Sequence, residues 1–252
     1  MADGDEDNGR AFPTRLRLSA KALRSASRAR RWLNRILVPH KRDARRLLRE
    51  RPQHIFQPGG GTSLDRYPHL FAALRDQLEV IQSPSVLSFG CSTGEEILSL
   101  RSYLPHARLS GIDINPSRIR AARKRINDPT VSLSAAANIE EAGGGRYDAI
   151  TCLSVMHRRE LLRDWPADGT KYMTFEMFER AILDFDRHLK PGGALLLYHT
   201  SFRFIETSVA LNYTPLLLVD PLSRDLTKQY DRNNRPVLEP LHERFALWRK
   251  EQ

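Results

Sequence analysis

Residues 86–96 read VLSFGCSTGEE, and this stretch decides the fold. Its first four residues are mostly apolar, which is typical of a short buried strand. Small residues follow, and then two glutamates that suit the first turn of a helix. The small residues allow a tight turn and let a ligand approach the backbone closely at the edge of a sheet. The stretch therefore predicts a strand, a ligand-binding loop and the start of a helix.

The next predicted strand ends in an acid. Residues 109–114 read LSGIDI, and Asp113 lies roughly 20 residues beyond the glycine turn, where a carboxylate accepts hydrogen bonds from both hydroxyls of a ribose. A glycine turn followed by such an acid predicts a nucleoside-binding crevice. The plain alternative is a sheet with a chance aspartate at a loop entrance.

Strands and helices alternate outward from these two segments. The predicted strands are 85–89, 108–114, 130–134, 146–153 and 194–198. The predicted helices are 70–78, 95–104, 116–126 and 175–189. This alternation predicts an α/β fold with a doubly wound, mostly parallel sheet and helices on both faces. Beyond about residue 200 the pattern weakens, and only a strand near 216–219 and a C-terminal helix near 241–248 are predicted.

The positive charge lies near the start of the chain. The 252 residues carry a formal charge of +10, whereas residues 10–51 alone hold 13 Arg and 2 Lys against 2 acids, a net charge of +13. We expect residues 1–51 to form a basic amphipathic helical arm that is partly disordered, and residues 52–68 to form a linker or lid loop. Residues 69–252 then form the α/β domain, with an unassigned extension from about 200. The arm suits RNA or an anionic membrane surface, and docking on the body is the structural alternative.

Several classes of protein are not predicted. No apolar run approaches the ~18–20 residues that span a bilayer. Two cysteines make no disulfide framework. None of the eight histidines has metal-ligand spacing, so no metal site is predicted. We expect a protein of the reducing cytoplasm, and the sequence leaves its oligomeric state open.

The quoted stretch resembles motif I of the class I S-adenosylmethionine (SAM)-dependent methyltransferases, and residues 90–96 are especially similar to the bacterial chemotaxis-receptor methyltransferases. Residues 111–116, GIDINP, resemble motif II. Residues 137–139, 146–157 and 189–194 follow in the family's order. The chain departs from the family at Asn138, where aspartate is commoner. It also lacks the substrate-domain signatures of the chemotaxis enzymes, so their substrate is not implied.

The resemblance implies a Rossmann-like methyltransferase fold over residues 69–252, with SAM as the cofactor. It assigns the cofactor site residue by residue: the loop to Gly90, Cys91, Ser92 and Gly94, the ribose to Asp113 with Ile114, and the adenine to Asn138 and Ile139. The implied activity is methyl transfer to an oxygen or nitrogen of an acceptor. A small molecule is the favoured acceptor, and an RNA held by the basic arm is the alternative.

The resemblance also places the end of the fourth strand, and with it His157, beside the transferred methyl group. An imidazole with a pKa near 6.5 suits removal of a proton at neutral pH. The neighbouring Arg158 and Arg159 are expected to lower that pKa and keep the ring neutral. The structural alternative is a histidine that caps the strand or faces solvent.

Two other functions fit parts of the pattern. Residues 90–94 also spell Gly-x-Ser-x-Gly, the nucleophile elbow of α/β hydrolases, with Ser92 as nucleophile. Asp148 or Asp164 with His199 would complete a triad. An elbow normally follows several strands, however, and a hydrolase gives no reason for Asp113. A binding module that has the fold without catalysis is the third alternative, because a fold does not fix a function.

Overall fold

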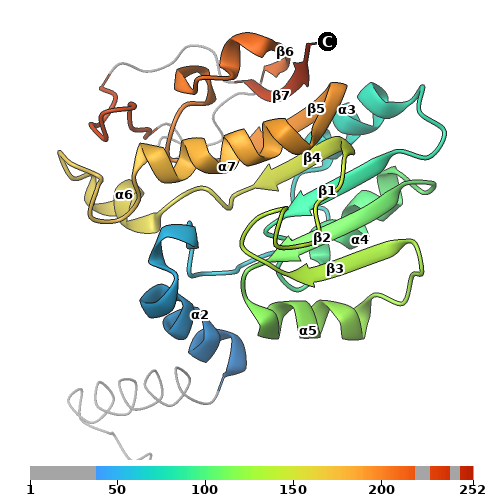
Figure 1. Ribbon diagram of the computed structural model, residues 1–252, viewed down its shortest axis with the longest axis horizontal. Coiled ribbons are helices and arrows are strands. Elements are labelled where there is room, and N and C mark those ends of the chain that lie inside the picture. The colour runs from blue at the N-terminus through green and yellow to red at the C-terminus, as the bar shows by residue number, and fades with distance from the viewer. Residues whose placement is uncertain (1–37, 219–227, 239–244, 252) are drawn as a thin grey trace, which may run out of the picture.

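The structure is a computed structural model that describes residues 38–218, 228–238 and 245–251. Seven strands form one sheet in the order β3-β2-β1-β4-β5-β7-β6 (Figure 1). The strands are β1 Ser85–Phe89, β2 Arg108–Asp113, β3 Val131–Ala135, β4 Tyr147–Leu153, β5 Leu189–Tyr198, β6 Tyr213–Leu218 and β7 Phe245–Lys250. The α-helices are α2 Pro39–Glu50, α3 Pro68–Leu78, α4 Glu95–Tyr103, α5 Pro116–Arg125, α6 Arg159–Asp164 and α7 Phe175–His188. Single turns of 3₁₀ helix lie at Pro52–His54, Phe204–Glu206 and Ala210–Asn212.

The chain reverses its direction of travel across the sheet at β1. Strand β1 pairs in parallel with β2 on one side and with β4 on the other. The chain therefore winds outward from β1 to β3 and then returns past β1 to form β4 and β5. Ligands bind at such a switch point, beyond the carboxyl ends of the strands. The doubly wound, mostly parallel fold is confirmed.

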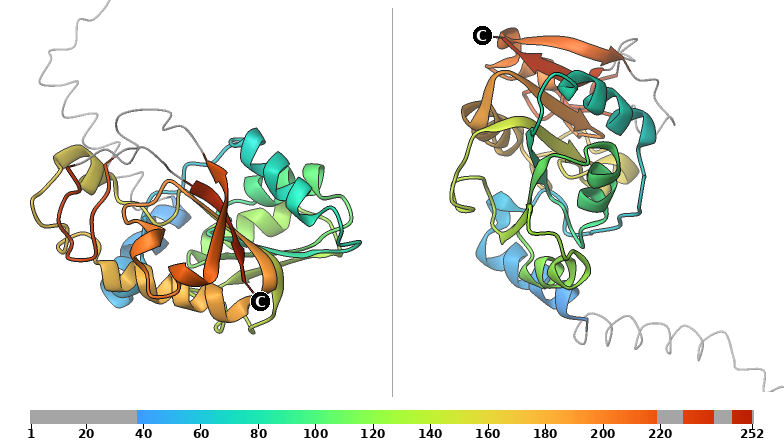
Figure 2. Two further views of the ribbon diagram at one scale, coloured as in Figure 1. Left: turned by 90° about the horizontal axis from the view of Figure 1, so that it is seen from above. Right: turned by 90° about the vertical axis from the view of Figure 1, so that its right-hand side faces the viewer.

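Helices lie on both faces of the sheet (Figure 2), and alternate residues of β1 belong to two separate hydrophobic clusters. Leu87 and Phe89 pack in the layer that holds the α7 side chains Phe178, Ile182 and Phe185. Val86 packs in the opposite layer, with side chains of α3 and α4. Burial on both faces explains why the central strands read as continuous apolar runs.

The predicted C-terminal helix near 241–248 is wrong. Residues Phe245–Lys250 form β7, which pairs antiparallel with β5 and with β6. Short apolar runs do not distinguish a helix from a strand by periodicity alone. Here the edge of β5 favours a strand, because pairing with β7 satisfies the backbone groups of β5. The same pairing buries Ala246, Leu247 and Trp248. The strand near 216–219 is present as β6.

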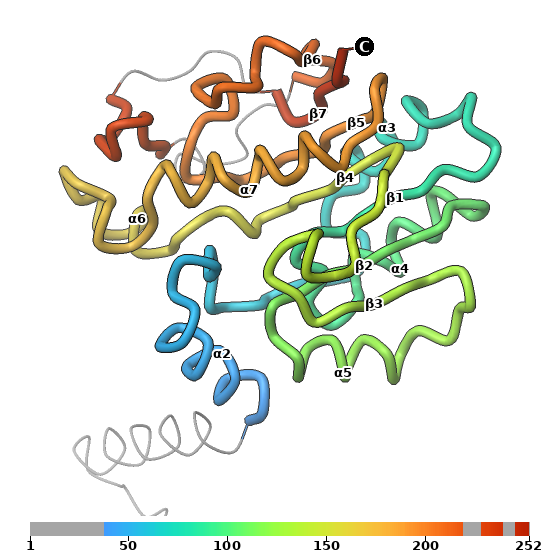
Figure 3. Tube along the Cα trace, in the orientation of Figure 1, coloured from blue at the N-terminus to red at the C-terminus, as the bar shows by residue number. Residues whose placement is uncertain are grey.

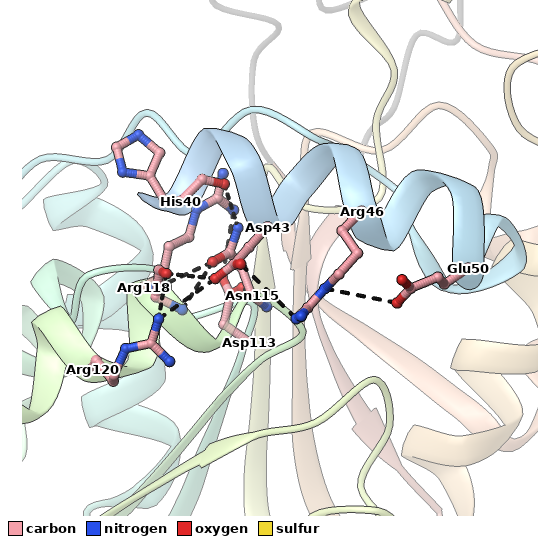
Figure 4. A network of polar contacts seen from close by, with 9 residues as sticks. His40, Asp43, Arg46, Glu50, Asp113, Asn115, Arg118 and Arg120 are labelled. Atoms are coloured by element: carbon pink, nitrogen blue, oxygen red, sulfur yellow. Dashed lines mark hydrogen bonds and ion pairs between the residues drawn. The ribbon is translucent and has the colours of Figure 1, made fainter. Parts of the chain in front are cut away.

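Only the end of the predicted basic arm lies within the described residues, since residues 1–37 fall outside them. Helix α2 begins at Pro39, a residue that suits the first turn. It packs on α5 through the Asp43 carboxylate, which accepts a hydrogen bond from Ser117, and through the His40 carbonyl, which accepts one of 2.8 Å from Asn115 (Figure 4).

The segment from residue 51 to 67 crosses from α2 to α3 past the carboxyl ends of the central strands (Figure 3). It includes most of the predicted linker or lid loop, and the candidate site lies beneath it. In the described part of the chain, no helix is long and apolar enough to cross a membrane.

Candidate active site

A cavity of about 870 Å³, including its open side, lies at the switch point of the sheet. Its floor consists of the ends of β1, β2 and β4 with the loops that follow them, and its roof consists of residues from 54 to 67. Five predicted cofactor residues line it: Gly90, Cys91, Ser92, Asp113 and Ile114. Its position beyond the carboxyl ends of the strands suits a nucleoside ligand.

The glycines of the first loop are required by backbone shape. Gly90 has φ +80°, and a Cβ there would lie 2.5 Å from the Val155 side chain. Gly94 has φ +92°, and a Cβ would lie 2.7 Å from Ile126. Positive φ of this size favours glycine. Gly94 therefore serves the packing of α4 on α5, and only Gly90 reaches the cavity.

Asp113 is held in one orientation at the end of β2. It is 6% exposed, and its carboxylate accepts hydrogen bonds from the backbone N–H of Asn115, at 2.8 Å, and of Ser92, at 3.1 Å. The Arg118 guanidinium lies 3.8 Å away (Figure 4). Burial raises the pKa of Asp113, and Arg118 and the two N–H groups oppose this shift. The carboxylate is thus held in one orientation at the cavity wall.

Arg118 also connects Asp113 to the roof of the cavity. Its guanidinium donates a 3.0 Å hydrogen bond to the Pro58 carbonyl, and Gly60 lies so close that a Cβ would be 2.3 Å from the guanidinium carbon. The glycine run of the loop therefore gives room to this arginine.

Glu96 lines the cavity. The sequence indicated only that its negative charge suits the first turn of a helix. Its Oε1 accepts hydrogen bonds from Thr151, at 2.6 Å, and Ser88, at 2.8 Å. Burial raises the pKa of Glu96 to about 7. The sequence does contain a signal for this position. Glu96 lies one helical turn before the buried Leu100, so both side chains face the sheet.

The two residues assigned to adenine lie away from this cavity. Ile139 is fully buried in the core, and its N–H donates to Asp184. Asn138 accepts a 2.8 Å hydrogen bond from the Glu141 N–H and lines a neighbouring hollow. That hollow shares Phe56, Phe89 and Ala137 with the main cavity. Among the residues that follow β3, Ala136 and Ala137 reach the main cavity instead.

His157 lies behind the cavity wall. The residue is 7% exposed, and its Nε2 lies 3.1 Å from the amide nitrogen of Gln57, a residue of the roof. Burial lowers the pKa of His157 to about 4, with Arg159 and then Arg66 contributing. The other expected contributor, Arg158, instead donates a 2.6 Å hydrogen bond to the Ile55 carbonyl.

Sequence reasoning missed Tyr67 and Ser154, which both line the cavity. The Tyr67 hydroxyl lies 2.6 Å from Ser154 Oγ, which lies 2.8 Å from His199 Nδ1. The His199 ring stacks on His157 with centroids 4.1 Å apart. Tyr67 belongs to the loop before α3, so no strand-end rule pointed to it.

The residues nominated for a hydrolase triad do not meet. Asp148 lies at the amino end of β4, where it accepts hydrogen bonds from Ser85 and Lys190, at the opposite edge of the sheet from Ser92. Asp164 is paired with Arg163 on the surface. The Gly-x-Ser-x-Gly pattern of residues 90–94 is therefore explained by the small residues that this loop requires.

Residues 87–195 match the model of a methyltransferase domain family. No curated protein matches the chain. Solved structures similar to it include the N-methyltransferase NodS from Bradyrhizobium japonicum WM9, at 19% identity and a TM-score of 0.48 over 75% of this chain and 100% of that one. Another is PKMT2 from Rickettsia typhi, at 17% identity and a TM-score of 0.42 over 55% of this chain and 26% of that one.

A third similar structure is StiE O-MT residues 961–1257, at 16% identity and a TM-score of 0.42, which covers 59% of this chain and 53% of that one. None of these TM-scores reaches 0.5, so the three structures carry no argument about the acceptor. The family match spans the glycine loop, Asp113 and the fourth strand. It agrees with the motif residues and with the cavity at the switch point, and residues 87–195 therefore form a methyltransferase domain.

Proposed function

We propose that the protein transfers a methyl group from SAM to an oxygen or nitrogen of a small-molecule acceptor bound beneath residues 54–67. The observation that carries this proposal is a cavity whose wall combines a fixed carboxylate, Asp113, with a second carboxyl group, Glu96. SAM supplies an electrophilic methyl group on a sulfonium. The protein's part is mainly placement, because holding the two reactants in line removes most of the entropic barrier.

The residues on the cavity wall fit the parts of SAM. Asp113 would accept the ribose hydroxyls, and the apolar Phe89, Ile114 and Ala137 suit the adenine face. The Glu96 carboxylate would hold the ammonium of the methionine portion. Asn138 remains a proposed adenine neighbour through the hollow beside Phe89, whereas the buried Ile139 lines neither this hollow nor the main cavity.

The experiment is calorimetric titration of SAM into the wild type and Asp113→Ala. We expect the variant to bind SAM at least tenfold more weakly, because it loses charge-assisted hydrogen bonds. Asp76→Asn is the matched control, since Asp76 is an exposed acid on α3. Unchanged affinity in Asp113→Ala, with an unchanged circular dichroism spectrum, would remove the assignment of the ribose site.

An RNA acceptor is the second candidate, and the surface beside the cavity favours it. Exposed basic residues of α2 and α5, two helices in contact, share one corner of the molecule: Lys41, Arg42, Arg45, Arg49, Arg120, Arg123 and Lys124. Phosphate contacts would make binding strongly dependent on salt. RNA affinity that does not fall between 50 and 200 mM salt would argue against this candidate.

A further inference from the structure

Three side chains form a hydrogen-bonded series that begins at the cavity wall. Tyr67 and Ser154 line the cavity. The Tyr67 hydroxyl and Ser154 Oγ are 2.6 Å apart, and Ser154 Oγ and His199 Nδ1 are 2.8 Å apart. The series therefore leads from the cavity to an imidazole, whereas His157 contacts the cavity only through Gln57.

The backbone holds two members of this series in an unusual conformation. Ser154 follows β4 with φ +57°, and His199 follows β5 with φ +58°. Non-glycine residues rarely adopt such angles, and they persist where the surrounding structure enforces them, often at functional sites. The Ser154 N–H donates a 2.9 Å hydrogen bond to the Tyr198 carbonyl. This bond joins the two strand ends and directs the two side chains toward each other.

The order of donors follows from counting protons. Each hydroxyl has one proton to donate. If His199 Nδ1 accepts from Ser154, then Ser154 Oγ is free to accept from the Tyr67 hydroxyl. The Tyr67 oxygen can then accept a proton from a group in the cavity. Burial raises the pKa of Tyr67, so its hydroxyl keeps its proton at neutral pH and can transmit one.

We propose that Tyr67, Ser154 and His199 form a proton relay that deprotonates a hydroxyl acceptor during methyl transfer. This inference rests on the proposed function. The acceptor oxygen forms a bond to the methyl carbon as the sulfonium carbon–sulfur bond breaks, and S-adenosylhomocysteine leaves. The acceptor proton passes to Tyr67, the Tyr67 proton to Ser154, and the Ser154 proton to His199, which becomes an imidazolium. Tyr67 is the catalytic residue of the relay, and the other two act through it.

The stacked His157 ring allows His199 to become an imidazolium at the end of the relay. Its pKa is lowered to about 4, so the ring beside His199 is neutral at physiological pH. Two stacked imidazolium rings would repel each other, and a neutral neighbour avoids that repulsion. Charged groups from other elements also act here: Arg66 and Glu96 on Tyr67, and Arg66 and Arg159 on His157.

The relay also restricts the acceptor class. An alcohol or phenol must lose a proton at neutral pH to become a good nucleophile, and a positioned base accelerates such a step about 10²–10⁴-fold. A carboxylic acid is already ionised and needs no relay. We therefore assign a hydroxyl, rather than a carboxylate, as the methylated group.

The first test reads the relay without any turnover. Nitrogen-15 NMR of histidine-labelled protein reports which ring nitrogen of His199 carries the proton. We expect the Nε2–H tautomer, with the Nδ1 resonance moving downfield in Ser154→Ala because Nδ1 loses its donor. An Nδ1–H tautomer in the wild type, or an unchanged resonance in Ser154→Ala, would overturn the relay.

The second test measures transfer from methyl-labelled SAM to phenol, catechol, benzyl alcohol and benzoic acid. The variants are Tyr67→Phe, Ser154→Ala and His199→Asn, the last chosen because asparagine tolerates positive φ. We expect each variant to lose about 10²-fold in the single-turnover rate with the best hydroxyl acceptor, with SAM affinity within about threefold of wild type. Tyr213→Phe is the matched control, because it removes a tyrosine hydroxyl that donates to Asp186 away from the cavity. A proton inventory in mixed H₂O and D₂O should be curved in the wild type and lose that curvature in Ser154→Ala.

The outcomes separate the two levels of the proposal. Failure of the wild type to bind SAM would remove the proposed function itself. SAM binding with methylation of benzoic acid and none of the hydroxyl compounds would overturn the hydroxyl assignment. Wild-type rates in Ser154→Ala or His199→Asn would overturn the relay while leaving the methyltransferase intact.

Discussion

Two carboxyl groups line the cavity, and their surroundings give them different properties. Asp113 has an arginine 3.8 Å away and two backbone N–H donors. Glu96 has only hydroxyl donors at close range, from Ser88 and Thr151. Hydroxyl donors compensate burial less than a cation does. Glu96 is therefore the group whose charge changes near neutral pH.

At the residue scale, Glu96 predicts that SAM affinity depends on pH. The pKa of Glu96 is about 7 in the folded protein, so the ionised fraction, and with it the attraction for an ammonium, rises as pH rises from 6 to 7. The amino group of SAM remains protonated in this range, since an ordinary α-amino pKa is about 7.7–8.0. We expect affinity to increase about fivefold over that unit of pH, as measured by calorimetry.

The matched variant is Glu96→Gln, which preserves the shape of the side chain and removes the titration. Its SAM affinity should be lower than wild type at pH 7 and nearly constant between pH 6 and 7. A variant that keeps the wild-type pH dependence would show that the titrating group lies elsewhere.

Glu96 also affects stability, with a definite sign. Its folded pKa of about 7 lies above the ordinary value of 4.5, so ionisation costs more in the folded state than in the unfolded one. Stability is therefore lost as pH rises from about 4.5 to about 7. Glu96→Gln should raise the melting temperature of the SAM-free protein more at pH 8 than at pH 4. Equal shifts at both pH values would contradict the raised pKa.

At the scale of elements, Asn115 connects the end of β2 and the start of α5 to helix α2. Its Oδ1 accepts hydrogen bonds from the N–H groups of Ser117 and Arg118, which caps α5. Its Nδ2 donates to the His40 carbonyl in α2, and its own N–H donates to Asp113 (Figure 4). Asn115 thus caps one helix, holds a second helix and lies beside Asp113.

Asn115→Ala should therefore have two separable effects. Loss of the cap is expected to cost about 1–2 kcal/mol in the free energy of unfolding, as measured by urea denaturation. Without the bond to His40, trypsin should cleave the basic helix α2 faster than it does in the wild type. Asn115→Ser keeps a capping hydroxyl but is too short to reach the His40 carbonyl, so it should retain most of the stability and still show faster cleavage. Equal cleavage in all three proteins would show that α2 is held by its other contacts.

The elements that sequence predicts correctly are those with strong local signals. The strand before Gly90, the strand that ends at Asp113 and the helix that begins at Pro116 each carry apolar patterning and an end signal, and all three are present. The error at β7 arises because its state depends on pairing with β5, which no local pattern encodes. For the same reason Tyr67 was missed, since it meets Ser154 only through the path of the loop over the sheet.

At the scale of the whole molecule, all residues that line the cavity belong to the segment from residue 54 to residue 155. Every residue that we assign to SAM lies within that range, and the roof is anchored to the floor through Arg118 and Pro58. Cofactor binding should therefore stabilise the whole domain. At a SAM concentration 100 times its Kd the stabilisation is about 2.7 kcal/mol, which corresponds to a rise of about 5–10 °C in melting temperature for a domain of this size.

The same geometry predicts what the N-terminal arm contributes. A chain that begins at Val38 retains the whole cavity wall, so its SAM affinity and its melting shift should equal those of the full chain. A small hydroxyl acceptor should be methylated at the same rate by both chains. Methylation of an RNA acceptor should instead be weakened without residues 1–37, because their net positive charge would add phosphate contacts to those of α2 and α5. Measuring SAM affinity, small-acceptor rate and RNA methylation in both chains separates these functions. Equal affinity and rate would confine the arm to a role outside the chemistry, and a shorter chain with weakened SAM binding would refute the assignment of the complete cofactor site to the described residues.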